Sequence, residues 1–362
     1  MNIKQQILQY RKENVFSILN GDNDYICFGA GKCFWDFIYN CCIKKDFPPP
    51  LFVCDNNEKM WGKSINIHGR DIEIVSPDMI REIDIDKTII AMSVTLPMGI
   101  LDDLVFKYRC IYHKIISLKS LETYFFWLDN RERLLRVYDC LEDERSRRYY
   151  EALFNHLLAG GFYAQDLFSA NPYWNNDVIS FLCDGDAIVH AGVFDGADID
   201  RALKLNRNIE IYGFEPDKAQ YELAAEKYKG FDNVRIYPFA LGERSGEGRF
   251  MSDGSSSAIV KNELREAARD IESVKVIGID DFFEDKKVNL IALDVEGVEP
   301  MVLSGGEKVI RRDGPKLAVC VYHELEHYVS LAEKIISLDA GYKLYFRHHS
   351  PVTIESVLYA IK

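Results

Sequence analysis

The chain has 362 residues, of which 48% are hydrophobic, and a formal net charge of −13 at pH 7. This length fits two domains, and the composition supports packed cores rather than a disordered chain. The negative charge argues against a nucleic-acid partner, because neutralising phosphates requires a basic surface.

The cysteines and the N-terminal segment indicate the compartment. None of the nine cysteines forms a CxxC pair, and four lie in or beside apolar runs, where a free cysteine behaves as a small hydrophobe: Cys27, Cys33, Cys54 and Cys183. The first 16 residues are polar, and no segment approaches the ~20 apolar residues that span a bilayer. We therefore expect a reduced, cytoplasmic protein without a membrane span.

Residues 1–120 alternate short apolar strands with helices, which predicts a small, parallel, Rossmann-like α/β domain. A GAGK turn at 29–32 follows the first expected strand, and Asp55 ends the second. These two features fit a nucleotide site. The preferred interpretation, however, is a degenerate Rossmann-like module used for packing, acceptor docking or the formation of a homo-oligomer.

Residues 121–185 are expected to form a helical connector. Apolar side chains recur with a period near 3.6 over residues 121–160, and the charged runs between them are typical of solvated helix faces. Four aromatic residues follow that could cover a sugar or pack in a core: Tyr163, Phe168, Tyr173 and Trp174.

Residues 186–362 show a second and clearer α/β pattern. Strands are expected at 187–191, 209–214, 234–239, 288–293, 316–322, 342–348 and 356–361. The last two are close in sequence, so they are expected to be antiparallel. An open, mostly parallel sheet with one reversed strand near its end is the arrangement of class I methyltransferases.

The turn after the first of these strands is a candidate ligand site, because open parallel sheets bind ligands beyond the carboxyl ends of their strands. Gly192, Asp195 and Gly196 lie in this turn, where glycine lets the backbone approach a ligand closely. Glu215 ends the next strand, at a spacing suited to binding both ribose hydroxyls. The alternative for Glu215 is a helix cap, a role that Asp217 could fill instead.

The same turn argues against NAD. Dinucleotides need a three-glycine fingerprint to seat their pyrophosphate, and GVFDGA places Phe194 and Asp195 inside it. A sulfonium cofactor carries no phosphate, and an acidic loop suits its positive charge.

Acidic residues also follow strand 288–293. Asp294, Glu296 and Glu299 lie within six residues of its end, and capping of the next helix is the alternative role for them. Strand 316–322 ends at His323. If these strands are neighbours, Asp294 and His323 face one crevice, where the imidazole could take a proton from a substrate hydroxyl.

Several ordered motifs within residues 186–362 resemble the FkbM family of methyltransferases: IVHAGVFDG, YGFEPD, LDVEGVEPMVLSGG, PKLAVCVYHE, LYFRHHS and ESVLYAI. The resemblance implies methyl transfer from S-adenosylmethionine to a hydroxyl, typically on a sugar or polyketide-like product. Two-domain members of the family also resemble the N-terminal half of this chain. The expected catalytic residues are Asp294, Glu296 and His323. The residues expected to bind the cofactor are His190, Gly192, Asp195, Gly196, Glu215, Pro216, Ser256 and Asp294.

Two positions depart from the family pattern. His190 stands where the family usually has an aspartate that orients the methionine end of the cofactor, and Val193 stands where it has a smaller residue. His190 could still form a hydrogen bond there. A weakened or specialised cofactor site, or an impaired enzyme, is the alternative that this departure leaves open.

Other functions remain as alternatives. The run HELEH, from His323 to His327, has the spacing of zinc proteases, but it directly follows an expected buried strand rather than lying on a helix. A divalent metal held by Asp294 with His323 or Glu324 could lower the pKa of the acceptor hydroxyl. At most one of the adjacent His348 and His349 could reach the crevice. A non-catalytic, two-module binding or scaffold protein is the remaining class.

Overall fold

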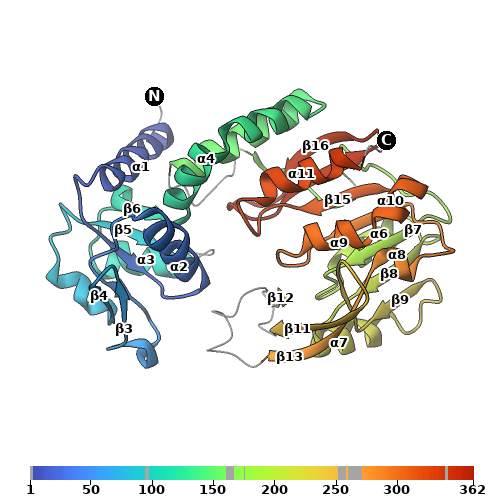
Figure 1. The fold of residues 1–362 in the computed structure, drawn as a ribbon, viewed down its shortest axis with the longest axis horizontal. Helices are drawn as coiled ribbons and strands as arrows, with labels where there is room; N and C mark the ends of the chain where they lie inside the picture. The colour runs from blue at the N-terminus through green and yellow to red at the C-terminus, as the bar shows by residue number, and fades with distance from the viewer. Residues whose placement is uncertain are drawn as a thin grey trace. The chain divides into compact units, whose positions relative to one another are not determined.

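The computed structural model describes residues 3–93, 98–159, 167–174, 176–251, 258–259, 271–338 and 341–362. The chain divides into two compact units (Figure 1). Unit 1 comprises Met1–Glu132, Glu151–Leu167 and Pro351–Thr353, and unit 2 comprises Arg133–Tyr150, Phe168–Ser350 and Ile354–Lys362. Described residues of the segment 121–185, predicted to be a helical connector, belong to both units.

Unit 1 contains a sheet with the strand order β3-β4-β2-β1-β5-β6, in which only β3 is antiparallel to its neighbour. Its strands are β1 (Tyr25–Phe28), β2 (Val53–Cys54), β3 (Ser64–Ile67), β4 (Arg70–Val75), β5 (Ile89–Met92) and β6 (Ile115–Ser117). Its α-helices are α1 (Ile3–Leu19), α2 (Lys32–Phe37) and α3 (Met98–Asp102), and π-helical turns at Ile38–Ile43 and Asp103–Lys107 extend the last two.

The hairpin β3–β4 is a feature that the sequence analysis did not predict. His68 and Gly69 form its two-residue loop, and both have positive φ angles, of 51° and 81°. Two consecutive residues with positive φ are the geometry of the tight turns that match the twist of a hairpin. The loop lacks the usual Asn-Gly or Asp-Gly pair, so the local sequence did not mark it.

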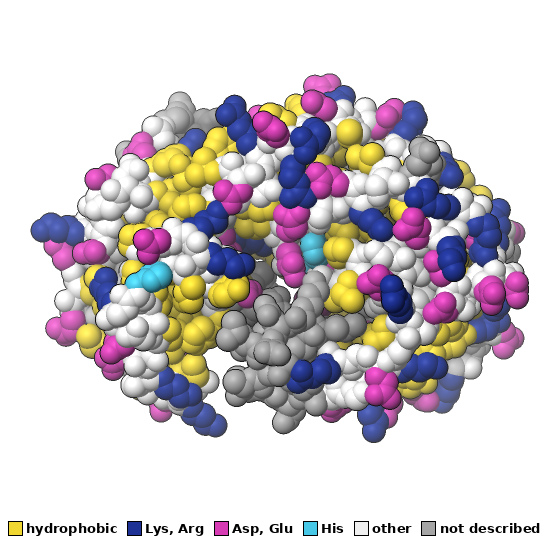
Figure 2. Space-filling model, in the orientation of Figure 1, with side chains coloured by type: hydrophobic (Ala, Val, Ile, Leu, Met, Phe, Trp, Pro, Cys, Tyr) yellow, Lys and Arg dark blue, Asp and Glu magenta, His cyan; other side chains and the backbone are white. Residues whose placement is uncertain are grey.

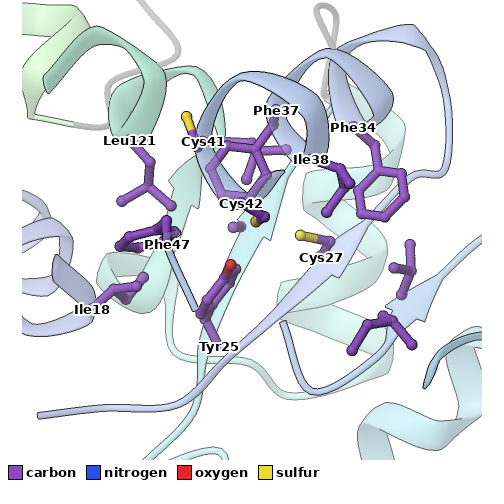
Figure 3. Packing of buried hydrophobic residues seen from close by; sticks show 14 of the residues in the cluster. Ile18, Tyr25, Cys27, Phe34, Phe37, Ile38, Cys41, Cys42, Phe47 and Leu121 are labelled. Atoms are coloured by element: carbon purple, nitrogen blue, oxygen red, sulfur yellow. The ribbon is translucent and has the colours of Figure 1, made fainter. Parts of the chain in front are cut away.

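Buried cysteines are part of the core of unit 1 (Figure 3). Cys27, Cys41 and Cys42 lie among the rings of Tyr25 and Phe37. Burial raises the pKa of the Cys42 thiol to about 12, so this residue stays protonated and behaves as a small apolar side chain.

The prediction that the other cysteines in or beside apolar runs behave as small hydrophobic residues was only partly right. Cys54 is buried, as expected, and burial raises its pKa to about 12. Cys33 and Cys183 are exposed. Both lie at the edge of an apolar run rather than within it, and hydrophobic neighbours in sequence do not decide the exposure of such a residue.

Unit 2 is built on a seven-stranded sheet with the order β16-β17-β15-β14-β7-β8-β9. Only β17 is reversed: it pairs antiparallel with both β15 and β16, and the other neighbours are parallel. The strands are β7 (Ala187–Ala191), β8 (Glu210–Phe214), β9 (Val234–Tyr237), β14 (Leu290–Leu293), β15 (Lys316–Cys320), β16 (Lys343–His348) and β17 (Ser356–Ile361). The predicted mostly parallel sheet with one reversed strand is confirmed.

Helices of unit 2 pack against this sheet (Figure 1). They are α6 (Ala197–Leu205), α7 (Lys218–Tyr228), α8 (Ile279–Phe282), α9 (Glu299–Gly305), α10 (Glu307–Asp313) and α11 (His327–Ser337). Asp217 begins α7 by accepting hydrogen bonds from the backbone N–H groups of Ala219 and Gln220. Two further helices, α4 (Lys119–Cys140) and α5 (Glu144–Leu158), have residues in both units.

A small second sheet in unit 2 was also not predicted. It has the order β10-β13-β11-β12, with β10 (Ala240–Leu241), β11 (Gly246–Met251), β12 (Ala258–Ile259) and β13 (Ile271–Ile277). β11 contains two glycines and two charged residues, and Glu272 and Lys275 interrupt the apolar residues of β13, so neither strand carries the continuous apolar run by which most strands of the large sheet were predicted.

Basic and acidic side chains are interspersed over the face of the molecule shown in Figure 2. Among the described residues, no helix combines the length and hydropathy needed to cross a membrane.

Candidate functional site

Three neighbouring strands of unit 2 end at the same level of the sheet. Their last residues pair with one another in register: Ala191, Phe214 and Leu293. The residues that follow are Gly192, Glu215 and Asp294, so the three turns singled out from the sequence meet at one edge. This edge lies where β7 separates β8 from β14, which is the switch point in strand order and the usual ligand crevice of an open parallel sheet.

Gly192 lies directly against the turn after β14. A Cβ atom on this residue would be 2.0 Å from the backbone oxygen of Asp294, and its φ angle is 86°. Any side chain would therefore collide with the neighbouring turn and strain the backbone. Close approach of the two turns explains the glycine at this position.

Glu215 connects the turn after β7 to the turn after β8. Its Oε2 accepts a hydrogen bond of 3.0 Å from the N–H of Phe194, and its Oε1 accepts one of 3.0 Å from the N–H of Asp217. Burial raises the pKa of Glu215, against the effect of these backbone donors. Because Asp217 caps α7, Glu215 is not needed for that role.

A cavity of about 330 Å³ lies at this edge. The described acidic residues that line it are Asp195, Asp198, Glu215, Asp294, Glu296 and Glu355. Arg201 is the only lysine or arginine among the described lining residues, and it is ion-paired with Asp198. An apolar wall is formed by Phe214, Ala240, Leu241, Phe250 and Val298. The cavity thus combines a strongly acidic part with an apolar part.

Asp294 is surrounded by hydrogen-bond donors. Tyr173 donates from its hydroxyl to Oδ2 at 2.7 Å, and Tyr322 donates to Oδ1 at 3.3 Å. Nε2 of His323 lies 3.2 Å from Oδ1. Burial alone would raise the pKa of Asp294, but His323 and Tyr173 lower it below its ordinary value. Asp294 is therefore an anion at neutral pH.

His323 lies behind Asp294 and is not among the described residues that line the cavity. Its Nδ1 atom is 2.9 Å from Oε1 of the buried Glu299, and its Nε2 atom is 3.7 Å from Oε1 of Glu296. Burial by itself would lower the pKa of His323, but these carboxylates and Asp294 raise it well above its usual value. The imidazole is therefore a cation at neutral pH.

Glu299 is fully buried and its charge is compensated from two sides. Besides His323, Nδ1 of His327 lies 3.4 Å from its Oε2 atom. Burial would raise the pKa of Glu299, but His323 and His327 lower it. Glu299 also accepts a hydrogen bond from the backbone N–H of Val295, so it combines a buried ion pair with a local backbone contact next to the start of α9.

Donor atoms of Asp294, Glu299 and His323 all lie within 4.8 Å of one another, which is close enough to hold a metal ion. However, the two ring nitrogens of His323 already contact both carboxylates directly. A protonated imidazole cannot ligate a metal, since ligating histidine must be neutral. These residues therefore fit an internal ion-pair cluster better than a metal centre.

The zinc-protease alternative is not compatible with the fold. α11 begins at His327, so His323 precedes the helix and the two histidines do not lie one turn apart on it. Both rings instead face the carboxylate of Glu299.

His190 lies in the core beneath the cavity. It is fully buried, its ring lies 5.6 Å from the ring of Tyr173 and 5.5 Å from that of Trp174, and its Nε2 is 4.0 Å from Oδ2 of Asp198. Burial lowers the pKa of His190, so the ring is neutral. His190, the position expected to orient the cofactor, is therefore next to the lining residue Asp198 but is not itself among the described residues that line the cavity.

The structure brings most of the predicted cofactor residues together, with two exceptions. Gly192, Asp195, Glu215, Pro216 and Asp294 line the cavity, as does the predicted catalytic residue Glu296. His190 and Gly196 are not among the described lining residues. Gly196 instead packs against Tyr228, and its φ angle of 75° permits the turn into α6. Ser256 lies outside the described residues.

The aromatic residues proposed as a lid have different positions. Tyr173 lines the cavity, whereas Trp174 is fully buried and donates from its ring N–H to the backbone oxygen of Asp198. Phe168 is 52% exposed and Tyr163 lies outside the described residues. Only Tyr173 is therefore placed to contact a ligand in the cavity.

His348 and His349 are both buried and bonded within the protein. Nδ1 of His348 is 2.9 Å from the hydroxyl of Ser356, and Nε2 of His349 is 2.8 Å from that of Tyr359. Neither is among the described residues that line the cavity.

Sequence reasoning missed several lining residues. Asp198 and Arg201 are in the first turns of α6, directly after the glycine turn, and this position could have identified them. Phe250 comes from the unpredicted small sheet, and Glu355 is a single acidic residue in the loop before β17. No local pattern marks Glu355.

Comparisons with known proteins agree with this geometry. Residues 186–344 match the family model described as the methyltransferase FkbM domain. The 2-O-methyltransferase NoeI of Sinorhizobium fredii (strain NBRC 101917 / NGR234) is 24% identical over 157 residues, which cover 38% of this chain and 65% of that relative. The match therefore spans just under two thirds of the curated relative.

The crystal structure of methyltransferase FkbM from Methylobacillus flagellatus KT has a similar fold. It aligns with a TM-score of 0.62 and 16% identity, over 99% of this chain and 98% of the other. The predicted fold class and the resemblance to the FkbM family are thus confirmed.

Proposed function

Because residues 186–344 match the model of the methyltransferase FkbM domain, we propose that the chain is an S-adenosylmethionine-dependent methyltransferase acting on a hydroxyl group. The observation that carries this proposal is the acidic cavity at the switch point of the unit 2 sheet, bordered by Gly192, Glu215 and Asp294. When bound, S-adenosylmethionine supplies an electrophilic methyl group on a positively charged sulfur.

The residues of the cavity fit this cofactor. Six described carboxylate residues against one arginine give a negative potential that suits a sulfonium and disfavours a phosphate-bearing ligand. Gly192 keeps the backbone free of side-chain atoms where the cofactor's amino-acid part is expected to bind. The carboxylate of Glu215 supplies acceptors for ribose hydroxyls, and Phe214, Leu241 and Phe250 supply apolar surface for the adenine ring.

For the acceptor, we propose a carbohydrate or a glycosylated biosynthetic intermediate. The similar protein NoeI is named a 2-O-methyltransferase, which supports transfer to oxygen. The polar floor formed by Asp294, Tyr173 and Tyr322 offers hydrogen-bonding groups that can orient a hydroxyl. Positioning of this kind can contribute about 7–11 kcal/mol to lowering a barrier.

For His323 we propose a different role from the one expected from the sequence. Because its imidazole is a buried cation, it has no free lone pair with which to accept the hydroxyl proton at neutral pH. We assign it to holding Asp294 and Glu299 ionised and in place. Asp294 in turn orients the acceptor from the floor of the cavity.

We propose that transfer does not depend on a divalent metal, because the donor set of Asp294, Glu299 and His323 is already neutralised internally. Turnover should be unchanged in excess EDTA. Loss of turnover in EDTA with recovery on adding Mg²⁺ or Mn²⁺ would show that this part of the proposal is wrong.

The function is tested by incubating the full chain with S-adenosylmethionine labelled at the methyl group and a panel of methyl glycosides of common hexoses. Label should appear in an acid-stable, base-stable ether product, and S-adenosylhomocysteine should inhibit the reaction. If the chain binds neither S-adenosylmethionine nor S-adenosylhomocysteine at millimolar concentration, the proposal fails and the non-catalytic scaffold becomes the better description.

A further inference from the structure

The cavity needs a group that can take up the acceptor's hydroxyl proton, and neither of the residues singled out from the sequence is suited to it. His323 holds its own proton at neutral pH, and it is not among the described residues that line the cavity. Asp294 lines the cavity, but its pKa is held low and its oxygens already accept from Tyr173 and Tyr322. An efficient general base has a pKa near the working pH, and a strongly stabilised carboxylate is a weak one.

Glu355 is a lining carboxylate whose properties differ from those of Asp294. It lies in the loop just before β17, and its backbone oxygen accepts a hydrogen bond of 2.9 Å from the N–H of His349. Its φ angle is 64°, a left-handed conformation that a non-glycine residue seldom adopts. Such strained positions persist where the surrounding structure holds them, and they cluster at functional sites.

The charges around Glu355 favour its protonated form. Burial raises the pKa of Glu355 to about 7, the nearby carboxylates of Asp294 and Asp198 add to this effect, and His323 and the Tyr322 hydroxyl act against it. Its proton affinity is therefore matched to neutral pH, unlike that of Asp294.

Tyr322 connects the two carboxylates. Its hydroxyl lies 3.3 Å from Oδ1 of Asp294 and 3.4 Å from Oε1 of Glu355. The hydroxyl has one proton, which it can donate to Asp294 or, when Glu355 is ionised, to Glu355. Tyr322 therefore helps to stabilise the ionised form of Glu355, which can accept a hydrogen bond from an incoming hydroxyl.

We propose that Glu355 is the proton acceptor for the hydroxyl that receives the methyl group, an inference that rests on the proposed function. As the acceptor oxygen forms its bond to the methyl carbon, the carbon–sulfur bond breaks and its electron pair stays on sulfur as a neutral thioether. The hydroxyl proton passes to the carboxylate of Glu355, which releases it to solvent before the next turnover.

The first test measures protonation of Glu355 without relying on activity. A carboxyl whose pKa rises on folding from about 4.5 to about 7 destabilises the folded state as pH increases through that interval. Glu355→Gln should therefore unfold at nearly the same temperature as wild type at pH 4, and at a higher temperature at pH 8. Glu284→Gln, at an exposed glutamate outside the cavity, should show no such growing difference. If the unfolding temperatures of Glu355→Gln and wild type differ by the same amount at pH 4 and at pH 8, the assignment is overturned.

The second test uses the glycoside that the wild type methylates fastest. Removal of a general base should lower kcat of Glu355→Gln by about 10²–10⁴-fold, with the Kd for S-adenosylhomocysteine unchanged within about twofold. Glu355→Asp, which keeps a carboxylate, should recover part of the loss. A Glu355→Gln enzyme with the wild-type kcat and pH profile would contradict the proposal.

The outcomes separate this inference from the proposed function. If wild type does not bind S-adenosylhomocysteine, the proposed function fails, whatever the state of Glu355. If it binds but methylates none of the glycosides, the carbohydrate acceptor is wrong and the pH dependence of unfolding alone decides the assignment of Glu355.

Discussion

Nδ1 of His323 lies 2.9 Å from Oε1 of Glu299, a carboxylate with no solvent exposure. The two residues are brought together because β14 and β15 are neighbours, so the turns that follow them meet. A buried carboxylate needs such compensation, since burial of an unpaired charge is costly. The pair fixes the turn that carries Asp294, and it makes His323 a structural cation.

Replacing His323 with glutamine should destabilise the protein by about 3–5 kcal/mol, because it leaves Glu299 with one of its two histidine partners removed. The raised pKa of His323 means that its contribution is fully present below about pH 6.5 and is lost as pH rises through the raised value. Urea unfolding as a function of pH measures both effects. The wild-type stability should fall on the alkaline side, and the variant should lack that fall; parallel curves would show that His323 is neutral.

How far the site could be predicted is illustrated by this pair. In the sequence, two apolar runs end at the polar residues Asp294 and His323, which marks the ends of two strands. If the strands are parallel neighbours, these two residues are expected to lie close together. The protonation state of His323, however, could not be predicted from the sequence. It depends on Glu299, whose side chain lies in α9 and turns inward, and a linear pattern cannot distinguish that orientation from a helix cap.

Gly192→Ala should disrupt the crevice, because its Cβ would lie 2.0 Å from the backbone oxygen of Asp294. We expect at least a tenfold weaker affinity for S-adenosylhomocysteine and a loss of stability of about 1–3 kcal/mol from the strained φ angle. Gly230→Ala is the matched control, since nothing lies within 4 Å of its Cβ position. Calorimetric titration of both variants decides this, and equal affinities would show that the two turns can separate without consequence.

Arg347→Met should destabilise unit 2 by about 3–5 kcal/mol, because the buried guanidinium binds Asp143 and Asp177 at 2.7 Å each. Burial would raise the pKa of Asp143, but hydrogen bonds from Arg347 and Ser146 lower it to about 2. The stabilisation is therefore present above about pH 4 and is lost as pH falls toward 2. Thermal unfolding of the variant and wild type between pH 2 and 7 tests this prediction. As a control, Arg235→Met, at an exposed arginine, should change stability by less than about 1 kcal/mol.

Tyr322→Phe should raise the pKa of Glu355 above its wild-type value of about 7, because the tyrosine hydroxyl stabilises the ionised carboxylate. The pH at which methyl transfer reaches half its maximum should move upward. The same upward movement should appear in the pH dependence of unfolding. A downward movement would mean that Tyr322 accepts a hydrogen bond from Glu355 in the resting state.

The fold was more accessible to prediction than the lining of the cavity. Most strands of the large sheet carry apolar runs, and their parallel direction follows from βαβ connections. β11, which brings Phe250 to the cavity, lacks such a run. Glu355 lies more than 60 residues after Asp294 in an ordinary loop, and only the antiparallel pairing of β17 with β15 brings it back to the crevice.

The central claim is that S-adenosylmethionine binds at the carboxyl ends of β7, β8 and β14, with Glu215 holding the ribose. Isothermal titration of the full chain with S-adenosylmethionine, compared with Glu215→Ala and the exposed control Glu284→Ala, tests it most directly. We predict saturable binding to one site in the wild type and in the control. In Glu215→Ala the affinity should be at least tenfold weaker, because two ribose hydrogen bonds are lost. Equal affinity of Glu215→Ala and wild type, or no binding at all, would contradict the account.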